Sequence, residues 1–352
     1  MKLSVERILE LSNAFGPSGF EDEVVEQIRG YLKKTSYALT EDTLRNLYVK
    51  KEKKDALRVM LDAHTDEVGF MVQSLLPQGT MRLAPIGGWG PLQVSSLRLV
   101  AKNHEGERIP GIVASRPPHF GADPDRTPEL SQMTFDVGAR DMQELKESFG
   151  IGLATPLVPH VQSRFDEKRG LLYGKAFDCR IGCAALVETL LRLDEKDAAF
   201  ELVATFSSQE ETGLRGTTIT APQIKPDIAI VFEGAPADDT FPVDQVQCAI
   251  GKGPMLRHMD KSMITHPRFQ RFALDVAKKE GIPHQEAVRL GGGTNAAVIH
   301  LTNRGVPTIV LGVPVRYIHS GEGIARLSDV EDTVRLALAI LDQITEETIR
   351  TW

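Results

Sequence analysis

The sequence of 352 residues predicts an α/β protein into which a β-rich, barrel-like domain is inserted. Short apolar runs of strand length alternate with longer segments of helical periodicity, which is typical of a layered α/β core. A change of composition between about residues 73 and 165 indicates the insertion. We therefore expect one domain built from residues 1–72 and 166–352, and a second built from residues 73–165. The length agrees, since it suggests two domains or one large domain with an insertion.

The strands of the α/β part are predicted from four apolar runs that lack polar alternation, as expected for strands covered on both faces. These runs occupy residues 57–63, 202–206, 228–232 and 308–311. Patterns with helical spacing of apolar residues occupy residues 3–14, 181–193, 267–280 and 329–345. A break at Gly-Pro-Ser-Gly, residues 16–19, separates the first helix from a second one that begins near Val24.

The segment from about residue 73 to 165 has a different character. It is rich in glycine and proline, as in PIGGWGP, GERIPG and SRPPHFGADP, and its short runs alternate Val, Ile and Leu. Such a pattern favours a small β-barrel or sandwich.

Composition and charge exclude several classes of protein. The net charge of −7 argues against nucleic acid or an anionic membrane as a partner. No run approaches 18 uncharged apolar residues, and Glu6 and Glu10 interrupt the first segment, so neither a membrane span nor a signal peptide is expected. Three cysteines, an odd and sparse set, fit a reducing compartment. We expect a cytoplasmic protein.

Cys179 and Cys183 are four residues apart and would share one face of a helix. They can be metal ligands, but no nearby cysteine or histidine in the sequence completes a thiolate site. The alternative is that both are small buried residues.

Candidate metal ligands gather at the predicted strand ends. In open α/β sheets, ligands bind beyond the carboxyl ends of the strands. The first run ends beside His64 and Asp66, and the second beside Glu210 and Glu211. The remaining candidates, at the third and fourth runs and just before a predicted helix, are Glu233, His319 and Asp178.

Two histidines and three carboxylates at one sheet edge form a donor set that suits zinc, cobalt or manganese. Five ligands that include one bridging carboxylate are what two ions about 3.5–4 Å apart require. Such a pair acidifies a shared water and polarises a carbonyl, and a carboxylate outside the ligand set can take the proton of that water.

Each residue also has an ordinary structural interpretation. A histidine near a strand end is commonly a hydrogen-bonded structural residue, and the pair Glu210–Glu211 can be a solvated surface patch. Asp178 can be the N-cap of the helix that follows it. The metal interpretation is favoured because all of these residues fall at comparable topological positions.

Seven segments, in order and spread over nearly the whole chain, carry a family resemblance. They are HTDEVGF (64–70), IGGW (86–89), KAFDCR (175–180), QEETGLRG (209–216), GGGTN (291–295), GVPT (305–308) and RYIHS (316–320). They resemble the motifs of the tetrahedral dodecameric metallo-aminopeptidases, a family that includes glutamyl and deblocking aminopeptidases.

The resemblance implies a role for each matching position. His64 and Glu233 would hold one divalent ion, Glu211 and His319 the other, and Asp178 would bridge them. Zinc or cobalt is the expected metal, and manganese is a third choice. Glu210 would be the general base that activates the metal-bridged water, and Asp66 would orient His64. Glycines 291–293 fit neither the dinucleotide nor the P-loop fingerprint, and are expected to line the peptide site.

The resemblance also implies a zinc-peptidase-like mixed sheet flanked by helices, with the insertion serving as a dimerisation domain. Dimers would build a closed dodecamer that admits short peptides. The expected function is thus removal of N-terminal residues from short peptides by a cytoplasmic homo-oligomer.

Three positions depart from the family pattern. Glu233 stands where aspartate is frequent, Asn295 where GGTD is common, and Cys179 where aspartate or asparagine is common. Asn295 lacks the carboxylate that the family commonly has at this position, which affects the expected substrate pocket but not the metal ligands. The Cys179 thiol can affect metal choice or sensitivity to oxidation.

Other functions stay open at this stage. The same metal chemistry cleaves any amide, so a metal-dependent deacylase of small N-acyl compounds is the main alternative. A glycoside hydrolase needs two carboxylates and generally no metal pair, and it favours an aromatic cleft, whereas aromatic residues are only 6% of this chain. A non-catalytic scaffold would have lost a ligand or the base, but all are present.

Overall fold

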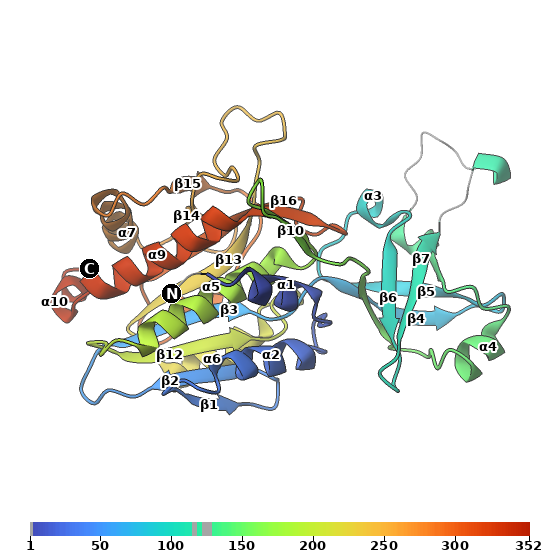
Figure 1. The fold of residues 1–352 in the computed structure, drawn as a ribbon, viewed down its shortest axis with the longest axis horizontal. Coiled ribbons are helices and arrows are strands. Elements are labelled where there is room, and N and C mark those ends of the chain that lie inside the picture. Colours follow the sequence, from blue (N-terminus) through green and yellow to red (C-terminus); the bar gives the residue numbers. More distant parts are fainter. Residues whose placement is uncertain (1–2, 115–117, 122–128) are drawn as a thin grey trace.

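The computed structural model describes residues 3–114, 118–121 and 129–352, which form a larger and a smaller part (Figure 1). The larger part is a mixed sheet flanked by helices, and the smaller part is a closed β-barrel. The predicted fold class is confirmed. Division of the chain at residues 73 and 165 stays a prediction. The barrel strands run from β4 (Gly69–Leu75) to β9 (Pro156–Pro159).

Four parallel strands form the centre of the larger sheet and carry the predicted site. In spatial order they are β12 (Glu201–Ser207), β3 (Arg58–His64), β13 (Ile228–Pro236) and β16 (Thr308–Arg316). Because all four run in the same direction, their carboxyl ends meet at one edge.

The flanking strands are antiparallel. On one side of the centre lie β2 (Leu47–Lys51) and β1 (Ala38–Glu41). On the other side lie β17 (Gly323–Arg326), β11 (Leu171–Gly174) and β10 (Arg164–Asp166). A branch leaves β16 through β14 (Met255–Met259), which is antiparallel to β16, and continues to β15 (Gln285–Val288), which is parallel to β14.

The central strands are apolar because helices cover both faces of the sheet. In β3, Val59 and Leu61 belong to one buried cluster, whereas Met60 between them belongs to another. The first cluster includes apolar residues of α1 (Val5–Asn13), α2 (Asp22–Leu32), α5 (Phe177–Asp194), α7 (Pro267–Lys279) and α9 (Leu327–Gln343). The second includes residues of α6 (Arg215–Ile224) and α8 (Ala296–Ile299). The chain ends in α10 (Glu346–Arg350).

The barrel has its own core, which includes Phe70, Phe135 and Leu157. Between β4 and β9 its wall contains β5 (Thr80–Ile86), β6 (Arg98–Lys102), β7 (Arg108–Ala114) and β8 (Thr134–Asp136). The same part of the chain contains the short helical segments α3 (Pro91–Val94), η1 (Pro118–Phe120), η2 (Leu130–Gln132) and α4 (Met142–Glu147). Of the predicted SRPPHFGADP stretch, residues 115–117 and 122–124 lie outside the described residues.

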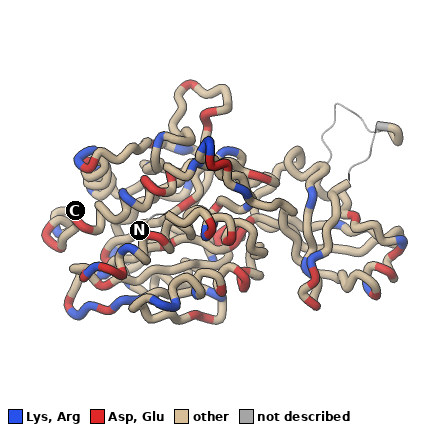
Figure 2. Tube along the Cα trace, in the orientation of Figure 1, with Lys and Arg blue, Asp and Glu red and all other residues tan. Residues whose placement is uncertain are grey.

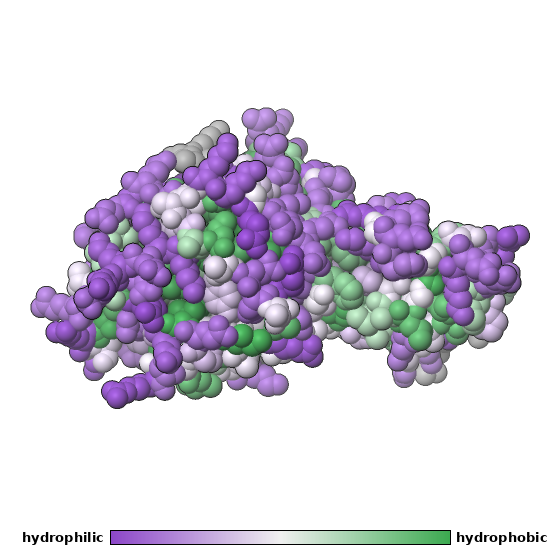
Figure 3. Space-filling view, turned by 90° about the horizontal axis from the view of Figure 1, so that it is seen from below, coloured by the Kyte–Doolittle hydropathy of each residue, from purple (hydrophilic) through white to green (hydrophobic). Residues whose placement is uncertain are grey.

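Basic and acidic residues are distributed along the chain in both parts (Figure 2). Apolar side chains are also visible on the barrel when the molecule is seen from below (Figure 3). Exposed apolar residues of the barrel part include Leu92, Ile112 and Leu153. Among the described residues, no helix has the length and apolar character needed to cross a bilayer.

Candidate active site

The sheet brings the predicted site residues to one edge, as the strand ends suggested. His64 is the last residue of β3 and lies opposite Ser207, the last residue of β12, so Glu210 and Glu211 follow close by. Glu233 lies inside β13, which continues to Pro236 rather than ending at residue 232. His319 follows β16, which likewise extends beyond the predicted residue 311 to Arg316.

Asp178 reaches the same edge from α5, which packs across β3 and β13. The helix pattern predicted from residue 181 begins earlier, at Phe177, but Asp178 and Cys179 have non-helical backbone angles. The N-cap position of α5 is Ala176, and the Asp178 carboxylate faces two histidines. The N-cap interpretation of Asp178 is therefore wrong.

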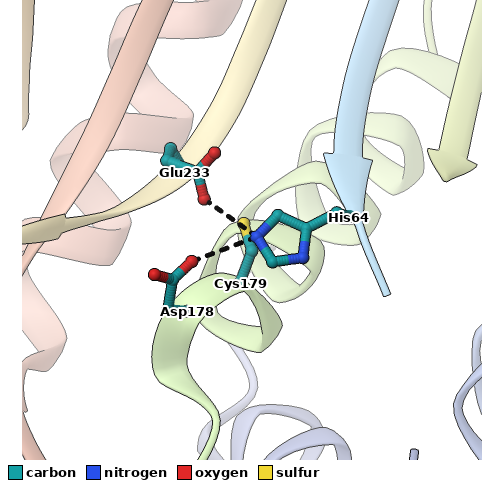
Figure 4. A group of neighbouring side chains, drawn as sticks. All are labelled: His64, Asp178, Cys179 and Glu233. Carbon is teal, nitrogen blue, oxygen red and sulfur yellow. Dashed lines mark hydrogen bonds and ion pairs between the residues drawn. The ribbon is translucent and has the colours of Figure 1, made fainter. Parts of the chain in front are cut away.

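The carboxylate of Asp178 lies between the two histidines. One oxygen, Oδ1, is 3.0 Å from His64 Nε2, and the other, Oδ2, is 3.2 Å from His319 Nε2. Glu233 Oε1 lies 3.3 Å from His64 Nε2, and Glu211 Oε1 lies 3.2 Å from His319 Nε2. Figure 4 shows the first group, with Asp178 and Glu233 both directed at the His64 ring. Two neighbouring clusters thus share Asp178.

Both histidines are oriented so that Nε2 points into the site. The Gly88 carbonyl can only accept, so His319 Nδ1 donates to it over 2.9 Å. His64 Nδ1 lies 3.2 Å from Asp66 Oδ1, which likewise leaves Nε2 free to bind a cation. Gly88 belongs to the IGGW segment after β5, so the barrel side of the chain contributes to the site.

Asp66 also holds the backbone of the acidic pair. Its Oδ1 accepts from the Glu210 amide at 2.9 Å and its Oδ2 from the Glu211 amide at 3.0 Å. Ser18 donates to Oδ2 at 2.6 Å. Asp66 thus fixes both the His64 ring and the loop after β12.

The carboxylates of the site are crowded and buried, and their pKa values reflect this. Burial raises the pKa of Glu210 well above its usual range, and burial raises the pKa of Glu211 to about 6. Burial also raises the pKa of Glu233. In each case the neighbouring Asp178 carboxylate adds to the effect. For Asp178, hydrogen bonds to the two histidines outweigh burial and lower the pKa.

The histidine pKa values are shifted in the opposite sense. Burial alone would lower the pKa of His319, but its contacts with Asp178 and Glu211 bring it to about 11. Burial would likewise lower the pKa of His64, but the surrounding negative groups, Glu233 first, raise it well above its usual range. The negative groups of the site therefore favour a cation, either a proton or a metal ion, at these two rings.

These features fit a pair of divalent cations. With Nδ1 donating to Gly88, neutral His319 presents a lone pair at Nε2 to the buried Glu211 Oε1, which has no hydrogen-bond partner among the described residues. A cation, either a proton or a metal ion, is needed between these two acceptors. The ligand atoms of Asp178, Glu211 and His319 lie within 4.8 Å of one another. Those of His64, Asp178 and Glu233, which we call the His64 group, do so as well. Imidazole and carboxylate donors together suit borderline divalent metals.

Several non-glycine residues around the site are held in the left-handed region. Strain of this kind, roughly 1–3 kcal/mol each, gathers where a site imposes a geometry. His319 itself has φ +54°, which aims its ring at Asp178. The others nearby are Ala176, Gln209, Leu214 and Tyr317.

A cavity of about 760 Å³ opens beside the clusters. Glycines 291–293 line this cavity, and its use as the peptide site stays a prediction. Two arginines line it as well, and each is paired: Arg257 with Asp260 at 2.9 Å and Arg289 with Asp238 at 2.7 Å.

The sequence interpretation missed several contributors. Ser18 was seen only as part of a chain break, although its hydroxyl binds Asp66. A Cβ on Gly87 would lie 3.2 Å from Glu211 Oε2, and one on Gly88 would lie 3.1 Å from His319 Nδ1. The paired glycines of IGGW were the available signal, since adjacent glycines indicate close approach of the backbone.

Comparison with known proteins identifies the family. Residues 46–336 match the family described as M42 glutamyl aminopeptidase. The chain belongs to the M42 family. Its relatives include the glutamyl aminopeptidase of Lactococcus lactis subsp. cremoris (strain MG1363), which is 33% identical over 350 residues, 98% of this chain and 97% of the relative. M42 proteins are peptidases, so the chain is classed as a hydrolase that acts on peptide bonds.

Solved structures agree with the M42 assignment. The TET aminopeptidase from the marine sediment archaeon Thaumarchaeota archaeon SCGC AB-539-E09 has a TM-score of 0.94 and 34% identity, with 98% of each chain covered. The TET1 peptidase of Pyrococcus horikoshii has a TM-score of 0.86 and 25% identity, with 97% of this chain and 99% of that chain covered. That protein is described as assembling into a tetrahedron or a large octahedral shell.

Proposed function

We propose that this M42 protein is a two-metal aminopeptidase that removes N-terminal residues from short peptides. The observation that carries the proposal is the Asp178 carboxylate, which offers one oxygen to the His64 cluster and the other to the His319 cluster. A shared carboxylate between two ligand groups is what a pair of ions about 3.5–4 Å apart requires.

His64 and Glu233 would hold one ion, Glu211 and His319 the other, and Asp178 would bridge them. When bound, two divalent ions acidify a water molecule and polarise the scissile carbonyl. Zinc or cobalt suits these nitrogen and oxygen donors, and manganese is a third choice. The exposure of His319 to the cavity gives a substrate carbonyl access to this edge.

Glu210 is assigned as the general base. Its Oε2 lies 3.9 Å from His64 Nε2, beyond the nearest carboxylates of that cluster but still beside it. It lines the cavity, so its carboxylate can accept a proton from water and then pass that proton to the leaving amine. Asp66 holds the Glu210 amide and thereby sets the position of the base.

Self-association would restrict the substrates. The exposed apolar side chains of the barrel, Leu92, Ile112 and Leu153, favour its use as a dimerisation surface. Such dimers would build a dodecamer, the assembly expected from the sequence. An enclosed particle admits short or unfolded peptides and excludes folded proteins.

The proposal is tested with chromogenic aminoacyl substrates and their N-acetylated counterparts, before and after treatment with a chelator. We expect cleavage of the substrates with a free amine only, loss of cleavage in chelator, and recovery with zinc, cobalt or manganese. Full activity in the metal-free protein would contradict the proposal. Faster cleavage of the N-acetylated set would support the deacylase alternative, and chelator-resistant cleavage of a β-glucan would support the glycoside hydrolase.

A further inference from the structure

The sulfur of Cys179 lies inside the ligand group of His64. Cys179 Sγ and the ligand atoms of His64, Asp178 and Glu233 are all within 4.8 Å of one another (Figure 4). The side chain is fully buried, and it follows Asp178 directly at the start of α5. The sequence places this thiol next to Asp178, a predicted ligand, but no histidine or cysteine near Cys179 in the sequence completes a thiolate site.

The fold fixes the sulfur at this place. Cys179 has non-helical backbone angles, φ −115° and ψ 32°, before the regular part of α5 begins. A Cβ on Gly182 would lie 2.4 Å from Cys179 Sγ, so a glycine there leaves space for the sulfur. Cys179 Sγ donates to the Phe232 carbonyl over 3.2 Å, which holds it beside β13 and the next residue, Glu233.

We propose that Cys179 is a ligand of the metal ion held by His64, Asp178 and Glu233. This inference rests on the proposed metal centre. Ligand atoms of one four- or five-coordinate zinc ion are roughly 3–3.5 Å apart, given bonds of about 2.0–2.3 Å, and a fifth position would remain for the water. The distances from His64 Nε2 to Asp178 and Glu233, 3.0 and 3.3 Å, already fall near that value. Cys179 would hold the ion as a thiolate, and its proton would be released to solvent.

The two metal positions then differ in kind. The group of Asp178, Glu211 and His319 contains no sulfur, whereas the His64 group together with Cys179 contains nitrogen, oxygen and sulfur donors. Thiolate favours zinc and other soft or borderline metals, and oxygen-rich sites favour manganese and magnesium. The His64 position is therefore selective for zinc over manganese, and the His319 position is more permissive.

Cys183 provides a matched control. It is also fully buried and lies on α5 four residues after Cys179, but its Sγ donates to the His64 carbonyl at 3.0 Å rather than joining a ligand group. The third cysteine, Cys248, belongs to a separate buried cluster. With three cysteines in the whole chain, a sulfur bound to a metal can be traced by single substitutions.

The experiment records the absorption spectrum of the full chain loaded with Co²⁺. A cobalt–thiolate bond gives a charge-transfer band in the near ultraviolet, which nitrogen and oxygen ligands do not produce. We expect this band in the wild type and in Cys183→Ser, and its loss in Cys179→Ser. Removal of a partner beyond the metal ligands already costs about 10–100-fold in affinity, so Cys179→Ser should weaken Zn²⁺ binding by at least about tenfold. Its Mn²⁺ affinity should stay unchanged.

Each contrary outcome has a separate meaning. Two cobalt ions bound per chain without the band in the wild type overturn the Cys179 proposal even if a variant fails to fold. A band that survives in Cys179→Ser, or that disappears only in Cys183→Ser, overturns it as well. Failure of the wild type to bind cobalt at all overturns the proposed metal centre together with this inference.

Discussion

At the scale of single residues, Glu210 and Glu211 are neighbours with different surroundings. Both backbone amides bind Asp66, so the pair has a fixed position. The two carboxylates lie close to one another and to His64, but the shortest histidine contacts differ. Glu211 Oε1 lies 3.2 Å from His319, whereas Glu210 Oε2 lies 3.9 Å from His64. The position of Glu211 therefore suits a metal ligand, and the position of Glu210 suits a general base.

This difference predicts opposite results for two substitutions. Glu210→Gln keeps the shape and removes the proton acceptor, so turnover should fall by roughly 10²–10⁴ while metal content stays near that of the wild type. Glu211→Ala removes a ligand, so one metal should bind weakly or be lost. Kinetics and metal analysis on both variants decide the matter. If Glu210→Gln emptied a metal site while Glu211→Ala left both filled, the two roles would be exchanged.

Asn295 has a structural explanation that the family pattern did not provide. It is buried below the site and is not among the residues that line the cavity. Its Nδ2 donates to Asp62 Oδ2 and to Ser207 Oγ, both at 2.8 Å, and its Oδ1 accepts from Thr217 at 2.8 Å. The side-chain amide therefore satisfies a buried carboxylate.

Asn295→Asp should consequently destabilise the fold. The substitution removes the donor to Asp62 and places two carboxylates in contact in the interior, at a cost of about 2–4 kcal/mol in the free energy of unfolding. Chemical denaturation at neutral pH measures this. The same change at exposed Asn303 is the control and should have little effect. Equal stability of the two variants would show that the buried amide is not needed.

The identity of the candidate residues could be predicted from the sequence, but their partners could not. His64, Glu211 and His319 stood out because each follows an apolar run. The contacts of Ser18 with Asp66 and of Gly88 with His319 join segments 48 and 231 positions apart in the chain, and no local pattern signals them. The ligand group around Cys179 could not be predicted for the same reason, since β3 and β13 supply His64 and Glu233.

At the scale of elements, the strand ends were harder to predict than the strands. β13 and β16 run on to Pro236 and Arg316, past the predicted ends at residues 232 and 311. Polar Glu233 ended the apolar pattern, yet it continues the strand because its ladder with β16 continues beyond it. The longer helices α1, α2, α5, α7 and α9 were predicted because their apolar faces pack on the sheet over several turns, whereas α6 and α8 were not predicted.

The segment leading into α2 contains a buried acid that couples stability to pH. Glu21 precedes the helix, is fully buried, and accepts through Oε1 from the amides of Gly19 and Gln209 at 2.9 and 3.1 Å. Its Oε2 has no partner among the described residues. Burial, with a contribution from the negative charge of Asp66, raises the pKa of Glu21 from 4.5 to about 7.

A raised carboxyl pKa means that the folded state binds more protons than the unfolded state between about pH 4.5 and 7. The contribution of Glu21 to stability is therefore present below pH 4.5 and is lost as the pH rises through 7, by about 3 kcal/mol at most. Glu21→Gln removes the titration. The free energy of unfolding of Glu21→Gln, measured relative to that of the wild type, should therefore increase by up to about 3 kcal/mol between pH 4.5 and pH 8.

Denaturant unfolding at both pH values measures this difference. The control is the same substitution at exposed Glu52, which should leave the pH dependence unchanged. If the free energies of unfolding of Glu21→Gln and the wild type changed with pH in the same way, Glu21 would not bind a proton between pH 4.5 and pH 8.

At the scale of the whole molecule, none of the proposed metal ligands lies in the barrel. If it mediates self-association, light scattering should give a mass well above the 38.7 kDa of one chain. Glutamate at the exposed barrel positions Leu92, Ile112 and Leu153 should produce smaller species, because charge opposes burial of an apolar surface.

Leu301→Glu is the matched control, because Leu301 is exposed on the α/β part and its replacement should leave the assembly intact. A monomer under conditions in which peptides are cleaved would contradict the expected assembly. Equal assembly of the barrel variant and the wild type would instead show that another surface joins the chains.

The measurement that tests the central claim most directly is the number of metal ions per chain during reactivation. Metal-free protein is titrated with Zn²⁺ while bound metal and cleavage of an aminoacyl substrate are measured together. Two ligand clusters that share Asp178 predict two bound ions per chain, with full activity reached only when the second ion binds. His319→Ala should bind one ion and remain nearly inactive. Full activity with one ion or none would contradict the two-metal site.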